Sequence, residues 1–133
     1  IRLFATPCEA RAVGFHQWMR DGLALYDALS GSYRRYDGGP VNGAMAEVFP
    51  HACTVALLGF IPPLREKRSI RRNLLERHGV DVSLLSSQDQ VDAALAALTG
   101  VIALENGHSS AGEGIDTMLL PARPLPARYE TRP

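Results

Sequence analysis

The sequence predicts a single α/β domain, and three observations support this fold class. The chain has 133 residues, the usual size of one domain with one hydrophobic core. Hydrophobic residues make up 46% and charged residues 21% of the chain, as in ordinary globular proteins and unlike disordered ones. Segments with helical spacing of apolar residues alternate with short apolar runs that are typical of buried strands. We therefore expect one domain over residues 1–121, followed by a proline-rich tail over residues 122–133.

The first element expected is a long helix over about residues 7–29. Thr6 and Glu9 have the spacing of a capping box, and Pro7 suits the first helical position. Apolar residues then recur at helical spacing as far as the Ser-Gly pair that ends the segment. The next stretch, over residues 30–43, is rich in Gly, Ser and Pro and has the composition of a connecting loop or a short irregular hairpin.

A short buried strand is expected over residues 44–50, where the sequence reads AMAEVFP. The run is apolar, and Pro50 ends it because the residue before a proline favours an extended backbone. Glu47 is the exception. A carboxylate buried without a partner is costly, so Glu47 must face a cation, a metal ion or water. A solvent-facing position on a half-exposed strand is the alternative explanation.

Two helices are expected next, one ending at Gly59 and one over residues 69–79 ending at Gly79. The region of the second helix is basic, and its basic residues are Arg65, Lys67, Arg68, Arg71, Arg72 and Arg77. Because 14 basic and 14 acidic residues balance over the whole chain, any contact with nucleic acid must be local. A binding patch and a solvated helix face both fit this run.

The last helix is expected from about Asp89, with Ser86 or Ser87 as its cap, to about Asn106. Its interior reads VDAALAALTGVIAL and is apolar nearly all round, which is the pattern of a helix packed closely against a sheet. A final strand is expected between residues 115 and 120.

Two carboxylates interrupt the start of this helix. Asp89 and Asp92 are three residues apart, so their side chains share a face and can converge on one point. Asp89 also fits a simple helix-start charge, whereas Asp92 lies past the capping positions. Two convergent carboxylates repel each other unless a cation lies between them, and Mg²⁺ prefers such oxygen ligands. The sequence therefore predicts a divalent-metal site at this helix.

Several segments together resemble a known family. The strand AEVFP at 46–50, the helix start DQVDAALAALT at 89–99 and the segment at 113–121 resemble, in that order, a family of predicted nucleases with a ribonuclease H-like fold, known as a domain of unknown function. The Thr6-Pro7 start and Trp18 also look like that family. The resemblance covers about positions 5–121 and implies that residues 1–121 are the C-terminal part of a ribonuclease H-like domain.

The resemblance also implies a reaction. Nucleases of this fold cluster acidic residues around one or two Mg²⁺ or Mn²⁺ ions, which activate water to cleave the phosphodiester bonds of DNA or RNA. By this resemblance Glu47 matches the later-strand acid, and Asp89 and Asp92 match the helix acids, so all three are expected to be catalytic residues and metal ligands. The residues expected to hold a substrate phosphate are Lys67, Arg71 and Arg72.

One feature of the family is missing. Its first acid is usually an Asp on an opening β-hairpin, and the segment IRLFATPCEA offers no such strand. We therefore expect either the C-terminal part of a longer protein or a non-catalytic ribonuclease H-like module for binding or assembly. Because about two strands cannot cover a helix that is apolar on most sides, upstream strands or a homodimer partner are expected to cover it.

The cysteines and the apolar runs bear on localisation. Cys8 and Cys53 have no CxxC spacing and lie in helical segments, which predicts neither a zinc site nor a disulfide. No run reaches the roughly 20 apolar residues of a membrane span, and no export signal is evident. We expect a cytoplasmic protein that does not cross a membrane.

Overall fold

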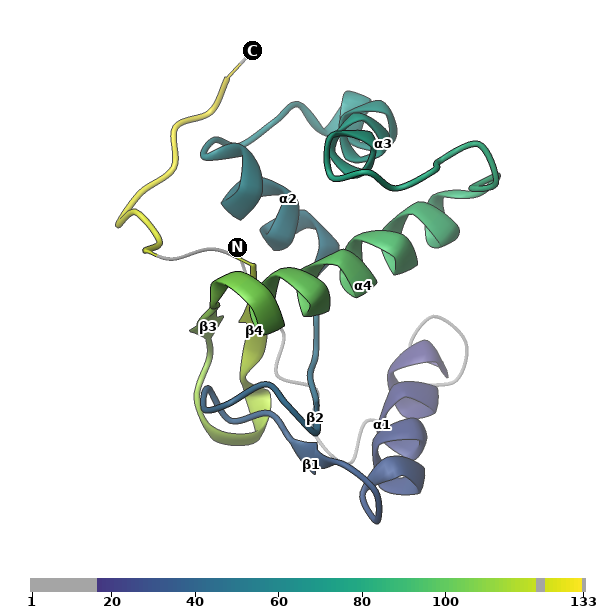
Figure 1. Ribbon diagram of the computed structural model, residues 1–133, viewed down its shortest axis with the longest axis vertical. Helices are drawn as coiled ribbons and strands as arrows, with labels where there is room; N and C mark the ends of the chain where they lie inside the picture. The colour runs from purple at the N-terminus through teal and green to yellow at the C-terminus, as the bar shows by residue number, and fades with distance from the viewer. Residues whose placement is uncertain (1–16, 122–123, 133) are drawn as a thin grey trace.

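The computed structural model describes residues 17–121 and 124–132, which are drawn in colour in Figure 1. Over these ranges the chain is a mixed α/β structure with four α-helices and two sheets of two strands each, so the α/β prediction is confirmed. The helices are α1 (Gln17–Leu29), α2 (Pro50–Leu58), α3 (Lys67–Arg77) and α4 (Gln88–Asn106). The strands are β1 (Arg34–Arg35), β2 (Ala44–Met45), β3 (Ser109–Ala111) and β4 (Met118–Leu120).

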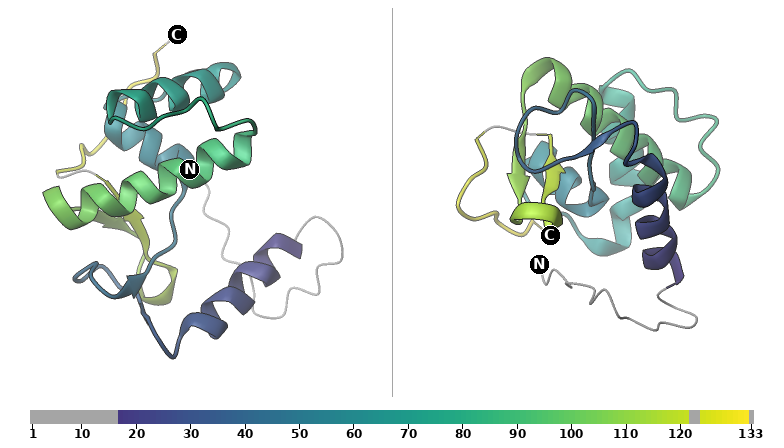
Figure 2. Two further views of the ribbon diagram at one scale, coloured as in Figure 1. Left: turned by 45° about the vertical axis from the view of Figure 1, so that its right-hand side comes forward. Right: turned by 90° about the horizontal axis from the view of Figure 1, so that it is seen from below.

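Three of the helices pack together, and the strands lie to one side of them. Helix α4 contacts α2, α3 and β4. Figures 1 and 2 show α3 across one side of α4, the strands on the other side, and α1 apart from the other helices. The part of the first predicted helix that precedes residue 17, with its capping box, lies outside the described residues.

The hydrophobic core has two parts. The larger part fills the space between α2, α3 and α4, and its fully or nearly buried residues are Cys53, Leu74, Leu75, Val82, Val91, Leu95, Leu98 and Leu120. The smaller part joins the strands to the end of α4 through Tyr36, Ala103 and Leu119. Helix α4 contributes to both parts, so it is the element on which the others assemble.

The start of α4 follows the predicted capping pattern. Ser87 is the cap: its Oγ accepts a hydrogen bond from the Gln90 backbone N–H at 3.1 Å, and Gln90 Oε1 accepts one from the Ser87 N–H at 3.1 Å. This reciprocal pair satisfies two backbone donors that the helix itself leaves unpaired. Asp89 then lies in the first turn, where its charge is favourable to the helix dipole.

The ends of α2 and α3 also agree with the sequence. Gly59 and Gly79 follow these helices with φ values of 76° and 78°, a backbone conformation that glycine adopts without a steric penalty. Helix α2 begins at Pro50, so the proline that ends the preceding extended segment is also the first residue of the helix.

The strands are shorter than the sequence indicated. The strand expected over 44–50 is reduced to β2 and one parallel bridge between Glu47 and Met118, while the final strand is Met118–Leu120. Strand β3 was not expected, and β1 lies in the segment expected as a loop or a short irregular hairpin. Strand β1 pairs in parallel with β2, and β3 pairs antiparallel with β4. Such two- and three-residue strands depend on their partners and have no hydrophobic period of their own to reveal them.

The C-terminal segment packs back on the domain. Within residues 124–132, the Glu130 carbonyl accepts a hydrogen bond from the Ile61 N–H at 2.8 Å, and the Arg132 N–H donates to the Ile61 carbonyl at 3.2 Å. Leu125 packs against the larger core. The proline-rich composition of this tail did not predict these contacts. Most of them are backbone hydrogen bonds, which leave no apolar pattern in the sequence.

The two faces of α4 provide a matched stability test. Leu95 is fully buried and Leu104 is 61% exposed on the same helix. We expect Leu95→Ala to lower the free energy of unfolding by about 2–5 kcal/mol, since it removes buried methyl groups and leaves a cavity. Leu104→Ala, the control, should change it by less than about 0.5 kcal/mol. Urea unfolding followed by circular dichroism measures both; equal losses would contradict this assignment of the two faces.

Candidate functional site

Asp92 lies in a polar network between α3 and α4. It occupies the second turn of α4, and its Oδ1 accepts hydrogen bonds from an Arg71 guanidinium N–H and, at 2.6 Å, from Gln88 Nε2. Gln88 is four residues earlier on the same helix, so the two side chains lie on one face. Arg71 comes from α3, which packs directly against α4. The carboxylate is therefore held in one orientation by donors from two helices.

The Arg71–Asp92 pair is mostly removed from solvent. The side chain of Arg71 is 5% exposed and that of Asp92 is 28% exposed. A guanidinium buried without a counter-ion would be strongly unfavourable, so Asp92 is what allows Arg71 to lie under the surface. The Nε of Arg71 has no hydrogen-bond partner among the described residues, which makes the remaining contact with Asp92 more important.

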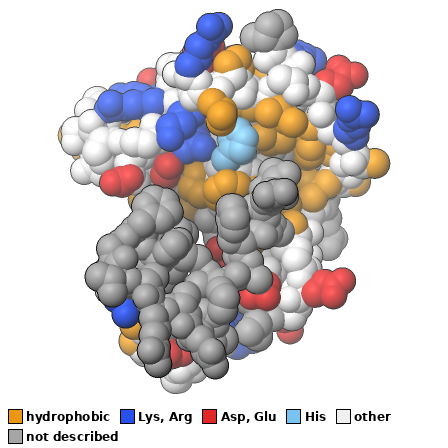
Figure 3. Space-filling view, turned by 180° about the vertical axis from the view of Figure 1, so that it is seen from behind, with side chains coloured by type: hydrophobic (Ala, Val, Ile, Leu, Met, Phe, Trp, Pro, Cys, Tyr) orange, Lys and Arg blue, Asp and Glu red, His pale blue; other side chains and the backbone are white. Residues whose placement is uncertain are grey.

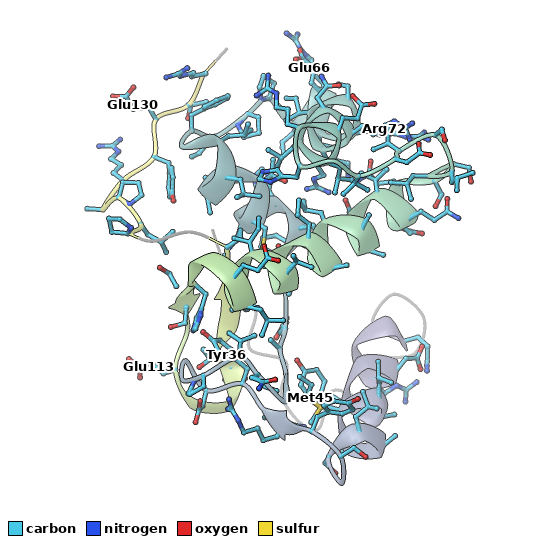
Figure 4. The ribbon with its side chains drawn as sticks, in the orientation of Figure 1. Tyr36, Met45, Glu66, Arg72, Glu113 and Glu130 are labelled. Carbon is cyan, nitrogen blue, oxygen red and sulfur yellow. The ribbon has the colours of Figure 1, made fainter. Side chains whose placement is uncertain are left out.

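The other arginines of α3 are also engaged. Arg72 donates from Nη1 to the Leu85 carbonyl at 2.5 Å and from Nη2 to the Val82 carbonyl at 2.8 Å. Figure 4 shows Arg72 directed toward the loop that connects α3 to α4. Arg68 donates to the Ser86 carbonyl of the same loop at 2.6 Å. These side chains satisfy loop carbonyls, so they are not simply a solvated basic face.

The predicted phosphate-binding residues therefore differ in how many of their hydrogen-bond donors are still available for a ligand. Arg71 and Arg72 use guanidinium donors within the protein. Lys67 is exposed at the first position of α3, with no hydrogen bond or ion pair to another described residue. Figure 3 shows Lys and Arg side chains gathered next to a histidine and an apolar area on the rear face. Whether any of the three binds phosphate stays a prediction.

His51 lies near this basic group, in the first turn of α2. Partial burial lowers the pKa of His51 below its ordinary value of 6.5, and the positive charges of Arg71 and Lys67 lower it further. The side chain is therefore neutral at pH 7 and can accept a hydrogen bond. Its position beside Arg71 agrees with the edge of a polar site, but it makes no direct contact with a carboxylate in the described part of the chain.

The three predicted acids are placed differently from one another. The Glu47 side chain is exposed, which agrees with the solvent-facing alternative, and its backbone carbonyl accepts a hydrogen bond from Leu119 N–H at 2.9 Å. Asp89 is exposed at the helix start, and Asp92 faces Arg71. No three His, Cys, Asp or Glu side chains of residues 17–121 and 124–132 lie close enough together to hold a metal ion.

A physical reason explains this difference from the sequence analysis. Two convergent carboxylates repel each other and need a cation, and in the sequence a metal ion was the expected cation. Arg71 is that cation for Asp92, and its approach from another helix left no signal in the local sequence. Asp89 is neutralised only by solvent and the helix dipole. The roles of Glu47, Asp89 and Asp92 as catalytic residues or metal ligands stay predictions.

Glu47 has a set of neighbours that the sequence did not point out. Tyr26 of α1 lies under the Arg35 guanidinium, with the Arg35 Cζ 4.9 Å from the ring centre. Burial raises the pKa of Tyr26, the charge of Glu47 raises it further, and Arg35 opposes both effects. These residues come from α1, β1 and the end of the β2 segment. In the sequence, only the aromatic and basic run Tyr33–Tyr36 could have indicated this group of residues. That run lies in the segment expected as a loop or a short irregular hairpin.

The described residues form a small α/β domain, and its sequence matches the model of a protein family. The family is described as "Protein of unknown function (DUF429)", and its sequence profile matches residues 2–114. The chain therefore belongs to this family. No curated protein and no solved structure matches the chain. Among the described residues, no helix has the length and apolar character needed to cross a membrane.

The Arg71–Asp92 pair can be tested by its effect on stability. We expect Asp92→Asn to lower the free energy of unfolding by about 1–3 kcal/mol, because it leaves the Arg71 guanidinium buried without a counter-ion; the part-exposed Asp92 keeps this below the cost of a fully buried pair. Asp89→Asn, at an exposed position, is the matched control and should change it by less than about 0.5 kcal/mol. Urea unfolding measures both variants. An unchanged midpoint for Asp92→Asn would show that the pair does not hold α3 to α4.

His51 predicts a particular pH dependence. Since its pKa is lower in the folded protein than in the unfolded chain, the unfolded chain binds the extra proton first as the pH falls. The stability linked to neutral His51 is fully present above pH 6.5 and is lost as the pH falls below that value. His51→Gln should flatten this part of the stability profile, whereas His78→Gln, at an exposed position, should not. Thermal unfolding at a series of pH values checks it, and parallel profiles for parent and His51→Gln would contradict it.

Proposed function

We propose that this chain belongs to a divalent-metal-dependent nuclease of ribonuclease H-like type, acting on DNA or RNA, with Glu47, Asp89 and Asp92 as its acidic residues. The observation that carries the proposal is the fixed orientation of Asp92, held by Arg71 and Gln88 beside a basic helix. Such preorganised carboxylates are typical of sites that handle phosphates and metal ions. The order of the motifs around Glu47 and Asp92 also supports it, and the family match over residues 2–114 includes them all.

The described residues do not by themselves fit a complete metal site. Oδ1 of Asp92 already accepts two hydrogen bonds, which leaves Oδ2 as its free oxygen, and the exposed Glu47 carboxylate belongs to no group of three acidic, His or Cys side chains among the described residues. When bound, Mg²⁺ or Mn²⁺ would supply an activated water molecule. The described residues contribute a fixed carboxylate, Asp92, an exposed carboxylate, Glu47, and nearby cations.

A second candidate is a non-catalytic module for binding or assembly. The Arg71–Asp92 pair favours it, because a carboxylate neutralised by a buried guanidinium has less need of a metal ion. In this candidate the pair is a structural link between α3 and α4. The exposed apolar side of α4, which includes Val101 and Leu104, would suit a homodimer contact. The homodimer and the cytoplasmic location stay predictions.

The two candidates differ in their response to metal and to Glu47→Gln. Labelled single-stranded DNA, duplex DNA and RNA should be cleaved by the purified chain in Mg²⁺ or Mn²⁺ and not in EDTA. Glu47→Gln should lower the cleavage rate by about 100-fold or more, since it removes a charged group from the site and keeps the side-chain volume. Because the side chain of Glu47 is exposed, this variant should keep its fold, which circular dichroism verifies.

Glu113→Gln is the control, because it removes an exposed carboxylate elsewhere in the domain. It should cleave like the parent protein. Titration of Mn²⁺ by calorimetry gives an independent readout, with binding expected for the parent and weakened binding for Glu47→Gln. Absence of both cleavage and Mn²⁺ binding would reject the nuclease and leave the non-catalytic module.

A further inference from the structure

Arg35 and Glu47 lie on one face of the small β1–β2 sheet. In the parallel register Arg35 is opposite Met45, and partner residues of a parallel pair project to the same side. Glu47 follows Met45 by two residues in an extended segment that continues to the Glu47–Met118 bridge, so it returns to the same side. Figure 4 shows Met45 on the side of the sheet toward α1. Residues from three elements therefore meet here.

The Arg35 side chain stacks on an aromatic ring and is 35% exposed to solvent. Its guanidinium lies over the Tyr26 ring, which restricts its rotamers. Its charged contact is with Asp27, at 3.7 Å from Nη2 to Oδ1, and Asp27 is 82% exposed. Exposed ion pairs of this kind are weak and readily exchanged. The Arg35 guanidinium donates no hydrogen bond to another described residue and forms no ion pair with Glu47.

This situation is the opposite of that in α3. There, Arg71 is buried against Asp92, and Arg72 and Arg68 are bonded to loop carbonyls. A phosphate that approached those arginines would have to replace contacts that hold the domain together. At Arg35 it would displace only one exposed carboxylate. The Arg35 guanidinium, with its side chain 35% exposed, is therefore more accessible than that of Arg71 on α3, which is 5% exposed.

We propose that Arg35, stacked on Tyr26, is the residue that binds the phosphate of a nucleotide unit, while Glu47 accepts hydrogen bonds from hydroxyl or amino groups of the same ligand. This inference rests on the proposed function, because it places the substrate phosphate beside Glu47. Arginine presents a planar fork of donors that matches phosphate oxygens in pairs. A carboxylate beside it selects a ligand that also carries donors, such as the hydroxyl and amino groups of a nucleotide.

The ion pairs of the β1 arginines set the salt dependence that we expect for ligand binding. Each arginine of β1 has a carboxylate partner, Asp37 for Arg34 at 3.6 Å and Asp27 for Arg35 at 3.7 Å. These pairs weaken the positive field at β1, so binding is not expected to depend on long-range attraction. Binding should depend on one direct phosphate contact and should vary little with salt, with a slope of log K against log salt of about −0.7 for a single-stranded ligand.

The test uses a short fluorescent single-stranded oligonucleotide, bound in EDTA and followed by anisotropy. Arg35→Ala should weaken binding by about 10-fold or more, the size of a lost charged hydrogen-bond pair. Arg35→Lys should recover only part of the loss because it keeps the charge without the fork. Tyr26→Leu should weaken binding and Tyr26→Phe should not. Arg65→Ala, which removes an 82% exposed guanidinium elsewhere, is the control and should bind like the parent.

The outcomes separate this inference from the nuclease proposal. Metal-free binding that depends on Arg35, together with no cleavage in any metal, supports the Arg35 site and rejects the nuclease. Metal-dependent cleavage with an unchanged KM in Arg35→Ala rejects the Arg35 site and keeps the nuclease. The inference is also overturned if the parent binds no oligonucleotide, if Arg35→Ala and Arg65→Ala weaken binding equally, or if the salt slope indicates many phosphate contacts. Circular dichroism verifies that each variant is folded.

Discussion

The buried guanidinium of Arg71 is the constraint on which much of this domain depends. Removed from water, it requires a carboxylate, and Asp92 supplies it from the neighbouring helix with Gln88 as a second donor. The pair fixes how α3 lies against α4, and that placement brings the Arg68 and Arg72 side chains to the carbonyls of the connecting loop. The apolar core between α2, α3 and α4 supplies most of the burial, and the ion pair selects one arrangement of it.

This arrangement divides the polar residues into two groups that differ in how available they are to a ligand. Around Asp92, the carboxylate is held by Arg71 and Gln88, and the Arg71 side chain is almost fully buried. Around Glu47, the partly exposed Arg35 guanidinium and the exposed carboxylate share one face without an ion pair between them. A ligand gains more from groups that are oriented but not already bonded. The second group is therefore the better place for a substrate to bind, and the first the better place for holding a carboxylate in position.

How far the sequence allowed prediction depended on the range of the interactions. Helices α2, α3 and α4 were predicted well because their signals are local: Ser87 caps α4, and Gly59 and Gly79 adopt the left-handed conformation that ends α2 and α3. The strands were predicted poorly, since β1 and β3 have two and three residues and exist only through distant partners. The tail is held at Ile61 by backbone hydrogen bonds, which the pattern of side chains in the sequence does not predict.

The sequence by itself determined the α/β class, the three later helices and the unusual status of Glu47 and Asp92, because hydrophobic period, capping and a charge within an apolar run are properties of neighbouring residues. Only the tertiary structure decided what those carboxylates face. Arg71 is 21 residues from Asp92 along the chain, and Tyr26 and Arg35 reach the surroundings of Glu47 from two other elements. Electrostatic partners act through space. The sequence around Asp92 indicated that its carboxylate needs a cation, and the fold supplies Arg71 as that cation.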